Sequence, residues 1–229
     1  MKITVVTLFP DFFAGPLGLS ILGRAATKGL VEYYVVALRD YTHDRHQTAD
    51  DQPYGGGAGM VLRPEPFFEA LEASKPEGPV VLLSARGRRF EHDDAVRFAV
   101  GGSLTLLCGH YKDVDQRVAD HLATAELSVG DFVLSGGEPA ALCMLDAVVR
   151  LLPGAVGDHE SAAGDSHYEG LLAPPSYTRP AEYRGHTVPE VLLSGDHGRI
   201  AMWRQAEAER LTRERRPDLW ARYLERMGD

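Results

Sequence analysis

The sequence predicts an α/β fold with a mostly parallel sheet, followed by a small α-helical domain at the C-terminus. Between residues 3 and 149, short apolar segments rich in β-branched residues alternate with amphipathic segments of helical period. This alternation is typical of strands joined by crossover helices, which make a sheet parallel. Beyond residue 196 only the helical pattern continues. The chain has 229 residues, 44% of them hydrophobic, which suffices for this two-part arrangement.

The expected strands are apolar at almost every position, as in central strands that are covered on both faces. They span residues 3–9, 31–38, 80–83 and 104–108. The expected helices carry apolar residues three and four positions apart, and Pro64 and Pro66 stand at the start of one of them. They span residues 17–26, 64–75, 92–100, 114–122 and 138–150, and later 196–213 and 218–226.

The stretch 128–138 combines three glycines with a short apolar run. Val129, Phe132 and Val133 are β-branched or aromatic and favour a buried strand. The glycines predict a tight loop before the next helix, because glycine permits positive φ and close approach to the main chain. Such a loop presents backbone N–H and C=O groups to a small polar ligand. The same composition also fits a strand-to-helix turn that binds nothing.

Several expected strands end in small residues or glycine. These ends lie at residues 84–87, 109–111 and 128–137. Because ligands of α/β proteins collect at the carboxyl ends of parallel strands, we expect these segments to line one crevice. No G-x-G-x-x-G pattern follows the first strand, which argues against a nicotinamide site.

Charge is distributed unevenly along the chain. The net charge is −9, but residues 1–196 contribute −11 (16 Lys and Arg, 27 Asp and Glu) and residues 197–229 contribute +2 (8 Arg, 6 Asp and Glu). Arginine suits bidentate phosphate contacts, so the C-terminal excess permits an RNA partner without requiring one. Cys108 and Cys143 lie in apolar runs, and we expect two free, buried thiols in a reducing cytoplasm.

Residues 39–60 form a polar, glycine-rich segment that is too long for a simple connection. His43, Asp44, His46 and Asp50 have side chains of the metal-ligand type, so a metal-dependent hydrolase is one alternative function. Their spacing matches no common zinc signature, and a solvated loop explains them as well. The glycines at 55–57 are not a phosphate-binding P-loop, because no Gly-Lys-Ser/Thr follows them.

Four motifs together resemble those of the bacterial tRNA (guanine-N1-)-methyltransferases, which belong to the trefoil-knot (SPOUT) methyltransferase superfamily. They are Thr-His-Asp-Arg-His at 42–46, Pro-Tyr-Gly-Gly-Gly-Ala-Gly-Met at 53–60, Leu-Cys-Gly-His-Tyr at 107–111 and Ser-Val-Gly-Asp-Phe-Val-Leu-Ser-Gly-Gly-Glu at 128–138. The resemblance covers nearly the whole chain. It implies a deep trefoil knot in a catalytic domain over 1–153, a flexible linker over 154–170 and a helical tRNA-binding domain over 171–229.

This resemblance also implies an activity. The protein is expected to transfer a methyl group from S-adenosylmethionine to N1 of guanine at tRNA position 37, next to the anticodon. It would act as a cytoplasmic homodimer with the site at the subunit interface, and it would use Mg²⁺, whose ligands we do not assign. Methylation at N1 needs a base near N1 and a cation or donor near O6. The resemblance gives the role of base to Asp165, with Arg150 steering that carboxylate or stabilising charge on O6.

The resemblance assigns binding residues in the same way. The cofactor would be held by Ser84, Gly109, Val129, Gly130, Asp131, Phe132, Val133, Leu134, Gly136 and Gly137. The substrate would be held by Asp50, Tyr54, Gly55 and Gly56. The apolar members of the cofactor set are equally explained as strand core.

The chain departs from the family motifs at two charged positions. Lys112 stands where the family usually has a glutamate at the methionine end of the cofactor, and Gln52 stands where it has an arginine. The first change removes an acceptor for the cofactor's amino group, and the second removes a cation from the substrate loop. Two further functions stay open on the sequence: methylation of another RNA by a related knotted enzyme, and RNA binding without catalysis.

Overall fold

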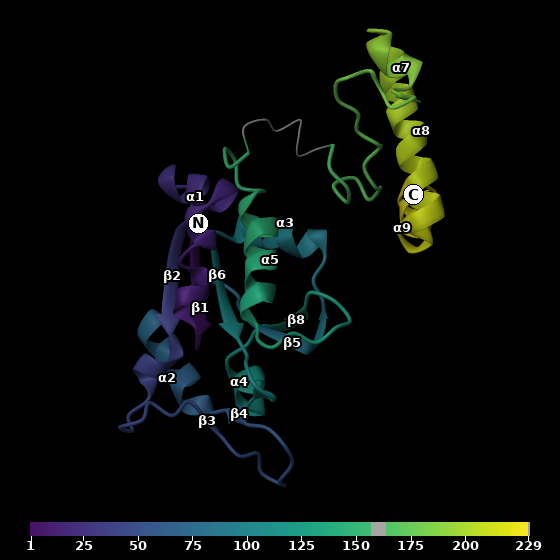
Figure 1. Ribbon diagram of the computed structural model, residues 1–229. Helices are drawn as coiled ribbons and strands as arrows, with labels where there is room; N and C mark the ends of the chain where they lie inside the picture. Colours follow the sequence, from purple (N-terminus) through teal and green to yellow (C-terminus); the bar gives the residue numbers. More distant parts are fainter. Residues whose placement is uncertain (157–163, 229) are drawn as a thin grey trace. The chain divides into compact units, whose positions relative to one another are not determined.

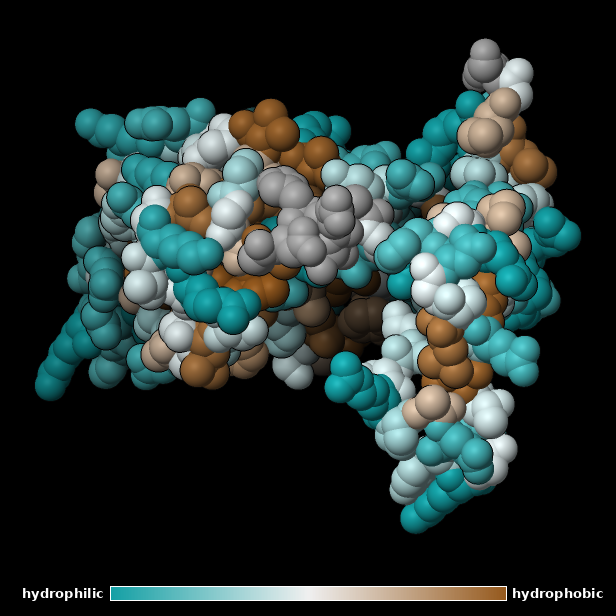
Figure 2. Space-filling view, turned by 90° about the horizontal axis from the view of Figure 1, so that it is seen from above, coloured by the Kyte–Doolittle hydropathy of each residue, from teal (hydrophilic) through white to brown (hydrophobic). Residues whose placement is uncertain are grey.

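The computed structural model describes residues 1–156 and 164–228, and the chain divides into two compact units, Met1–Gly157 and Asp158–Asp229 (Figure 1). The linker predicted over 154–170 includes residues 157–163, which lie outside the described residues. The face in Figure 2 is a mosaic of hydrophilic and hydrophobic residues. No helix in the described part of the chain is both long enough and apolar enough to cross a membrane.

The first unit is built on a five-stranded sheet in the order β2-β1-β6-β5-β8. Every pairing between neighbouring strands of this sheet is parallel, which confirms the predicted mostly parallel sheet. Its strands are β1 (Lys2–Thr7), β2 (Glu32–Ala37), β5 (Val80–Arg89), β6 (Ser103–Cys108) and β8 (Ala125–Ser128). Parallel neighbours place their carboxyl ends at one edge of the sheet.

Helices cover both faces of this sheet. They are α1 (Ser20–Thr27), α2 (Pro64–Ser74), α3 (His92–Gly101), α4 (Gln116–His121) and α5 (Glu138–Val149). Ile3 and Val5 of β1 pack in one core cluster with residues of α1, α3 and α5, whereas Val6 packs in a second cluster with residues of α2 and α4. Burial on both faces explains why these strands are apolar at almost every position. Short 3₁₀ helices lie at Pro10–Phe13, Pro16–Gly18 and Leu38–Tyr41.

β5 is longer than the strand predicted over 80–83, because it continues after a register shift. Leu127 of β8 pairs with both Leu83 and Arg88, so the residues between these two bulge out of the sheet. Gly87 lies where the bulge returns to β8. A Cβ built on Gly87 would lie 2.5 Å from the backbone carbonyl carbon of Glu126, so only glycine fits this crossing.

A small second sheet joins the long polar segment to the loop that follows β6. β3 (Asp50–Asp51) pairs antiparallel with β4 (Val61–Leu62), and β4 pairs parallel with β7 (Asp113–Val114). Strands of two residues leave no periodic pattern, so the sequence did not predict them. The glycine-rich segment between β3 and β4 is therefore anchored at both ends.

The buried strand predicted from Val129, Phe132 and Val133 is wrong. β8 ends at Ser128, whose Oγ donates a hydrogen bond to the carbonyl of Gly130 (2.8 Å) and closes a turn. The chain after this turn is a loop, and Phe132 and Val133 are 56% and 87% exposed. Their β-branched and aromatic side chains are available to a ligand or a partner instead of the core.

The two cysteines differ in environment. Cys108 is buried and free, as predicted, and burial followed by the charge of Glu138 raises the pKa of its thiol. Cys143 is also free but exposed, so the prediction of a buried thiol is wrong there. Its neighbours Met144 and Leu145 are buried, because the helical period of α5 turns them, and not Cys143, toward the core.

The second unit is helical, as predicted, and includes one hairpin. β9 (Glu182–Tyr183) and β10 (His186–Thr187) pair antiparallel, followed by α7 (Glu190–Leu193), α8 (His197–Arg215) and α9 (Pro217–Gly228). Thr212 Oγ1 donates to the carbonyl of Ala208 (2.7 Å) and accepts the N–H of Leu172 (2.8 Å). This hydroxyl ties the start of the unit to α8. The buried residues include Leu171, Ala208, Leu211, Thr212 and Leu219.

Candidate functional site

A cavity of about 180 Å³ opens in the first unit at the bulge of β5 and at the carboxyl ends of β6 and β8. Its lining includes residues 84–86, 109–114 and 132–137, together with Val129 and Ala140. The prediction that these three segments line one crevice is confirmed. The physical reason is the parallel sheet, which brings the ends of its strands to one edge.

Main-chain contacts hold two walls of the cavity together. The N–H of Gly137 donates to the carbonyl of Gly109 (2.8 Å), and His110 and Gly136 form an isolated antiparallel bridge. A Cβ built on Gly137 would lie 2.8 Å from Cα of Cys108, so a side chain at this position would force the two backbones apart. Glycine therefore lets α5 begin directly against the end of β6.

A buried polar cluster adjoins the cavity. Glu138, the first residue of α5, is 3% exposed and accepts a hydrogen bond from Thr7 Oγ1 of β1 (2.7 Å). Its second carboxylate oxygen lies 3.7 Å from Nδ1 of His110. The carboxylate therefore joins β1, α5 and the loop after β6. Sequence reasoning missed this cluster, because only the fold brings positions 7, 110 and 138 together.

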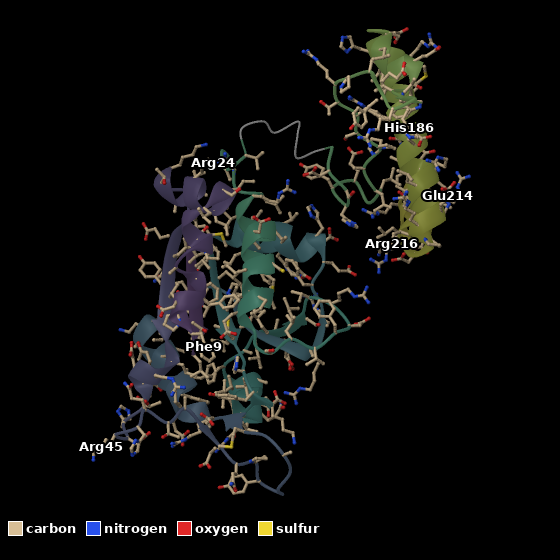
Figure 3. The ribbon with its side chains drawn as sticks, in the orientation of Figure 1. Phe9, Arg24, Arg45, His186, Glu214 and Arg216 are labelled. Carbon is tan, nitrogen blue, oxygen red and sulfur yellow. The ribbon has the colours of Figure 1, made fainter. Side chains whose placement is uncertain are left out.

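Aromatic and apolar side chains surround the cavity. Phe9, which follows β1, is labelled in Figure 3. The centroid of its ring lies 4.7 Å from the ring centroid of His110, and the ring centroid of Tyr111 lies 4.9 Å from that of His110. The exposed side chains of Phe132 and Val133 belong to the loop 132–137, which also lines the cavity. This combination of apolar surface and main-chain polar groups is typical of small-molecule sites.

The structure gathers most of the residues predicted to hold a cofactor. Gly130 and Asp131 belong to the same loop but do not line the cavity. Asp131 instead accepts a hydrogen bond from Arg89 (3.1 Å), an exposed ion pair that adds little stability. The predicted residues that do line the cavity are Ser84, Gly109, Val129, Phe132, Val133, Leu134, Gly136 and Gly137.

The residues predicted to bind the substrate lie on the segment between β3 and β4. Asp50 belongs to β3, and Tyr54 is fully exposed. Gly55 and Gly56 have positive φ values of 81° and 77°, which the backbone of glycine adopts without strain. Since β4 pairs with β7, this segment returns to the main body beside the edge of the cavity.

The two predicted catalytic residues belong to different units. Arg150 is the C-cap residue of α5, where a cation also complements the helix dipole. Asp165 lies in the second unit and lines a cavity of about 990 Å³ together with Tyr177, Arg179 and Arg204. The roles of Arg150 and Asp165 stay predictions.

In the polar segment 39–60, the side chains that could be metal ligands do not lie around one point. His43 Nε2 lies 2.7 Å from a carboxylate oxygen of Glu69. Asp44 accepts the N–H groups of Thr48 (2.8 Å) and His46 (2.9 Å), and these bonds, led by that of Thr48, hold the pKa of Asp44 below its usual range. Asp44 is thus a turn-closing residue. Within residues 1–156 and 164–228, no three His, Cys, Asp or Glu side chains are grouped to hold a metal ion.

Known proteins match the chain over nearly its whole length. The family model described as tRNA (Guanine-1)-methyltransferase TrmD matches residues 1–222. A protein of Rhodospirillum rubrum named tRNA (guanine-N(1)-)-methyltransferase is 54% identical over 225 residues, which cover 98% of this chain and 94% of that protein.

Two further relatives carry the same name. One from Dehalococcoides mccartyi is 52% identical over 96% of this chain and 90% of its own length. One from Levilactobacillus brevis is 52% identical over 96% of this chain and 89% of its own length. These identities and the family match show that the chain belongs to the tRNA (guanine-1)-methyltransferase TrmD family.

Proposed function

We propose that the protein transfers a methyl group from S-adenosylmethionine to N1 of guanine at tRNA position 37, adjacent to the anticodon. Membership of the family supports methyl transfer to a guanine of tRNA. The observation that carries the proposal is the cavity at the bulge of β5 and the carboxyl ends of β6 and β8. Parallel α/β sheets bind their ligands at this edge.

The cavity residues fit the parts of S-adenosylmethionine. The exposed apolar side chains of Phe132 and Val133 suit a flat adenine ring, and the main-chain groups of Gly109 and Leu134 suit its polar edges. When bound, the sulfonium supplies an electrophilic methyl group, which needs in-line positioning more than acid activation. The hydrogen bond between the main chains of Gly137 and Gly109 keeps the two walls at a constant separation. The proposed set also includes Ser84, Val129 and Gly136 of the cavity lining, and Gly130 and Asp131 of the loop that follows β8.

Asp165 and Arg150 complete the proposed chemistry. The carboxylate of Asp165 accepts the proton from guanine N1, and the N1–methyl bond forms as the sulfur–methyl bond breaks. Negative charge moves toward O6 while the proton leaves, and the guanidinium of Arg150 stabilises it or steers the carboxylate. Among the described residues no three His, Cys, Asp or Glu side chains are grouped to hold a metal ion, and we assign no step to Mg²⁺.

The proposal also assigns a role to each domain, an oligomeric state and the residues that contact the substrate. We assign catalysis to a knotted domain over 1–153, tRNA binding to the domain over 171–229, and their connection to the linker over 154–170. The protein is proposed to act in the cytoplasm as a homodimer with its site at the subunit interface. The eight arginines in 197–229 support contact with RNA. Asp50, Tyr54, Gly55 and Gly56 are proposed to contact the substrate.

Primer extension on tRNA transcripts tests the proposal. Methylation at N1 blocks the Watson–Crick edge of guanine, so reverse transcription is expected to stop at position 37. A transcript with adenine at that position should give no stop. Binding of radiolabelled S-adenosylmethionine is measured beside it. A stop only on another RNA would favour a related methyltransferase, and cofactor binding without any stop would favour an RNA-binding module. Absence of cofactor binding would overturn the proposal and revive the hydrolase alternative.

A further inference from the structure

Lys112 is held between the cavity and the glycine-rich segment 53–60. Its N–H donates to the carbonyl of Met60 (3.0 Å), and the next residue, Asp113, pairs with Val61 in the small sheet. Lys112 also lies at the edge of the cavity. Its backbone is therefore fixed by two neighbouring segments, which sets the direction in which its side chain leaves the main chain.

The side chain of Lys112 lies across the glycines of this segment. A Cβ built on Gly59 would lie 3.2 Å from Cβ and 3.5 Å from Cδ of Lys112. A Cβ built on Gly57 would lie 3.2 Å from its Nζ. Both glycines have positive φ, 92° at Gly59 and 115° at Gly57. Glycine at these positions lets the lysine stem lie against the main chain and leaves the ammonium beside Gly57.

The charges nearby indicate what this ammonium could bind. The glycine-rich segment 53–60 has no charged residue, and the residues just before it include Asp50 and Asp51. Residues 50–60 on their own therefore repel a phosphate. Lys112 is exposed, and within the described ranges 1–156 and 164–228 its ammonium has no hydrogen-bond or ion-pair partner. The adjacent Asp113 is paired with Arg86 (3.4 Å) instead. The cation is thus available to an anion from outside the chain.

We infer that Lys112 binds a backbone phosphate of the substrate RNA where the strand crosses this segment toward the cavity. The inference rests on the proposed RNA substrate. The side chain of Tyr54, fully exposed on the same segment, adds a surface on which a base can stack. Positive charge that contacts the backbone and exposed aromatic rings on which bases stack are the two elements with which proteins bind single-stranded RNA without reading its sequence.

The test compares three variants with the wild-type protein. Lys112→Met keeps most of the stem and removes the charge, and Lys112→Arg keeps the charge. Lys75→Met is the matched control, because Lys75 is exposed at the C-cap of α2 and does not line the cavity. Affinity for a tRNA transcript with guanine at position 37 is measured between about 50 and 200 mM salt, in the presence of the cofactor analogue sinefungin. Sinefungin affinity is measured separately by calorimetry.

One phosphate contact to a single strand contributes about 0.7 to the slope of log affinity against log salt. If the variant and the wild-type protein bind equally at 1 M salt, a slope that is smaller by this amount makes the variant bind about eightfold more weakly at 50 mM salt and about threefold more weakly at 200 mM. We expect these losses and the smaller slope in Lys112→Met only. Lys112→Arg and Lys75→Met should keep the wild-type slope, and all variants should keep wild-type sinefungin affinity.

An unchanged slope in Lys112→Met overturns the inference. Weaker sinefungin binding with unchanged tRNA affinity also overturns it, and would assign the ammonium to the carboxylate of the cofactor. Methylation of the transcript by the wild-type protein is measured first, which separates this failure from that of the proposed function. No methylation by the wild type overturns the proposed function, whereas methylation with an unchanged slope overturns only the assignment of Lys112.

Discussion

Replacing Gly137 by alanine is expected to weaken cofactor binding, since this glycine joins two walls of the cavity. A Cβ at this position would lie 2.8 Å from Cα of Cys108 and 3.0 Å from the backbone nitrogen of Gly109. Ordinary contact begins at 3.4 Å, so the two backbones must separate by about 0.6 Å. The flexible end of a side chain could move aside, but here both neighbours are main chain.

The size of the effect follows from this displacement. Overpacking costs about 1–3 kcal/mol, and the hydrogen bond from Gly137 to Gly109 contributes about 1 kcal/mol, which is lost if it breaks. The strain is relieved when the loop that ends at Gly137 moves away from Cys108 and Gly109. A bound ligand then loses contact with one of these two walls of the cavity. A loss of about 1.4 kcal/mol in binding free energy is tenfold in Kd. We therefore expect the Kd of sinefungin to rise at least about tenfold in Gly137→Ala.

Titration calorimetry with sinefungin measures this rise, and Gly101→Ala is the control. Gly101 is the last residue of α3, and a Cβ there would meet no atom within 4 Å. The control should keep the wild-type Kd. Circular dichroism establishes that both variants are folded. A folded Gly137→Ala protein with wild-type affinity would refute the reasoning that these two backbones together position the cofactor.

Three further predictions concern catalysis, a buried acid and the polar cluster. Asp165→Asn should slow single-turnover methylation about 10²–10⁴-fold without changing sinefungin affinity, and a wild-type rate in a rapid-quench assay would exclude Asp165 as the base. Asp94 is 4% exposed, and the two hydrogen bonds that it accepts from Arg88 (2.7 Å each) hold its pKa below the usual range. The stability that the ionised carboxylate of Asp94 contributes is complete above the pKa that this group has in the unfolded chain. It is lost as the pH falls through the lower pKa that the group has in the folded protein. Asp94→Asn should therefore cost about 2–3 kcal/mol in urea unfolding at pH 7 and progressively less below about pH 4, and a constant difference would contradict this. Thr7→Val leaves an oxygen of Glu138 without its donor and should cost about 1–3 kcal/mol in the same assay, whereas wild-type stability would show that the bond is dispensable.

The sheet and the cavity could be predicted from the sequence because each depends on local pattern. Strands buried on both faces have to be apolar throughout, so residues 80–83 and 104–108 stand out in the sequence. Once strands of this kind are joined by helices, they run parallel and their carboxyl ends meet. The convergence of 84–86, 109–114 and 132–137 follows from that rule without knowledge of any side-chain contact.

Other features were out of reach because they depend on pairing or on distance along the chain. Phe132 and Val133 read as strand core, but residue type does not show that pairing with β5 ends at Ser128. The hydrogen bond between Thr7 and Glu138 spans 131 positions and leaves no periodic signal. The same is true of Lys112, whose position across Gly57 and Gly59 arises only when β4 and β7 pair.

The pairing of β4 with β7 also has a thermodynamic consequence. Val114 lines the cavity and pairs with Leu62, which follows the segment 50–60. A small molecule that restricts this wall is therefore expected to restrict the adjoining end of the segment as well. A nucleic acid that orders the segment acts on the wall in return. The two association constants must then change by one shared factor, regardless of which molecule arrives first. If both ligands bind as proposed, the four paired residues of β4 and β7 are the contacts through which one is expected to affect the other.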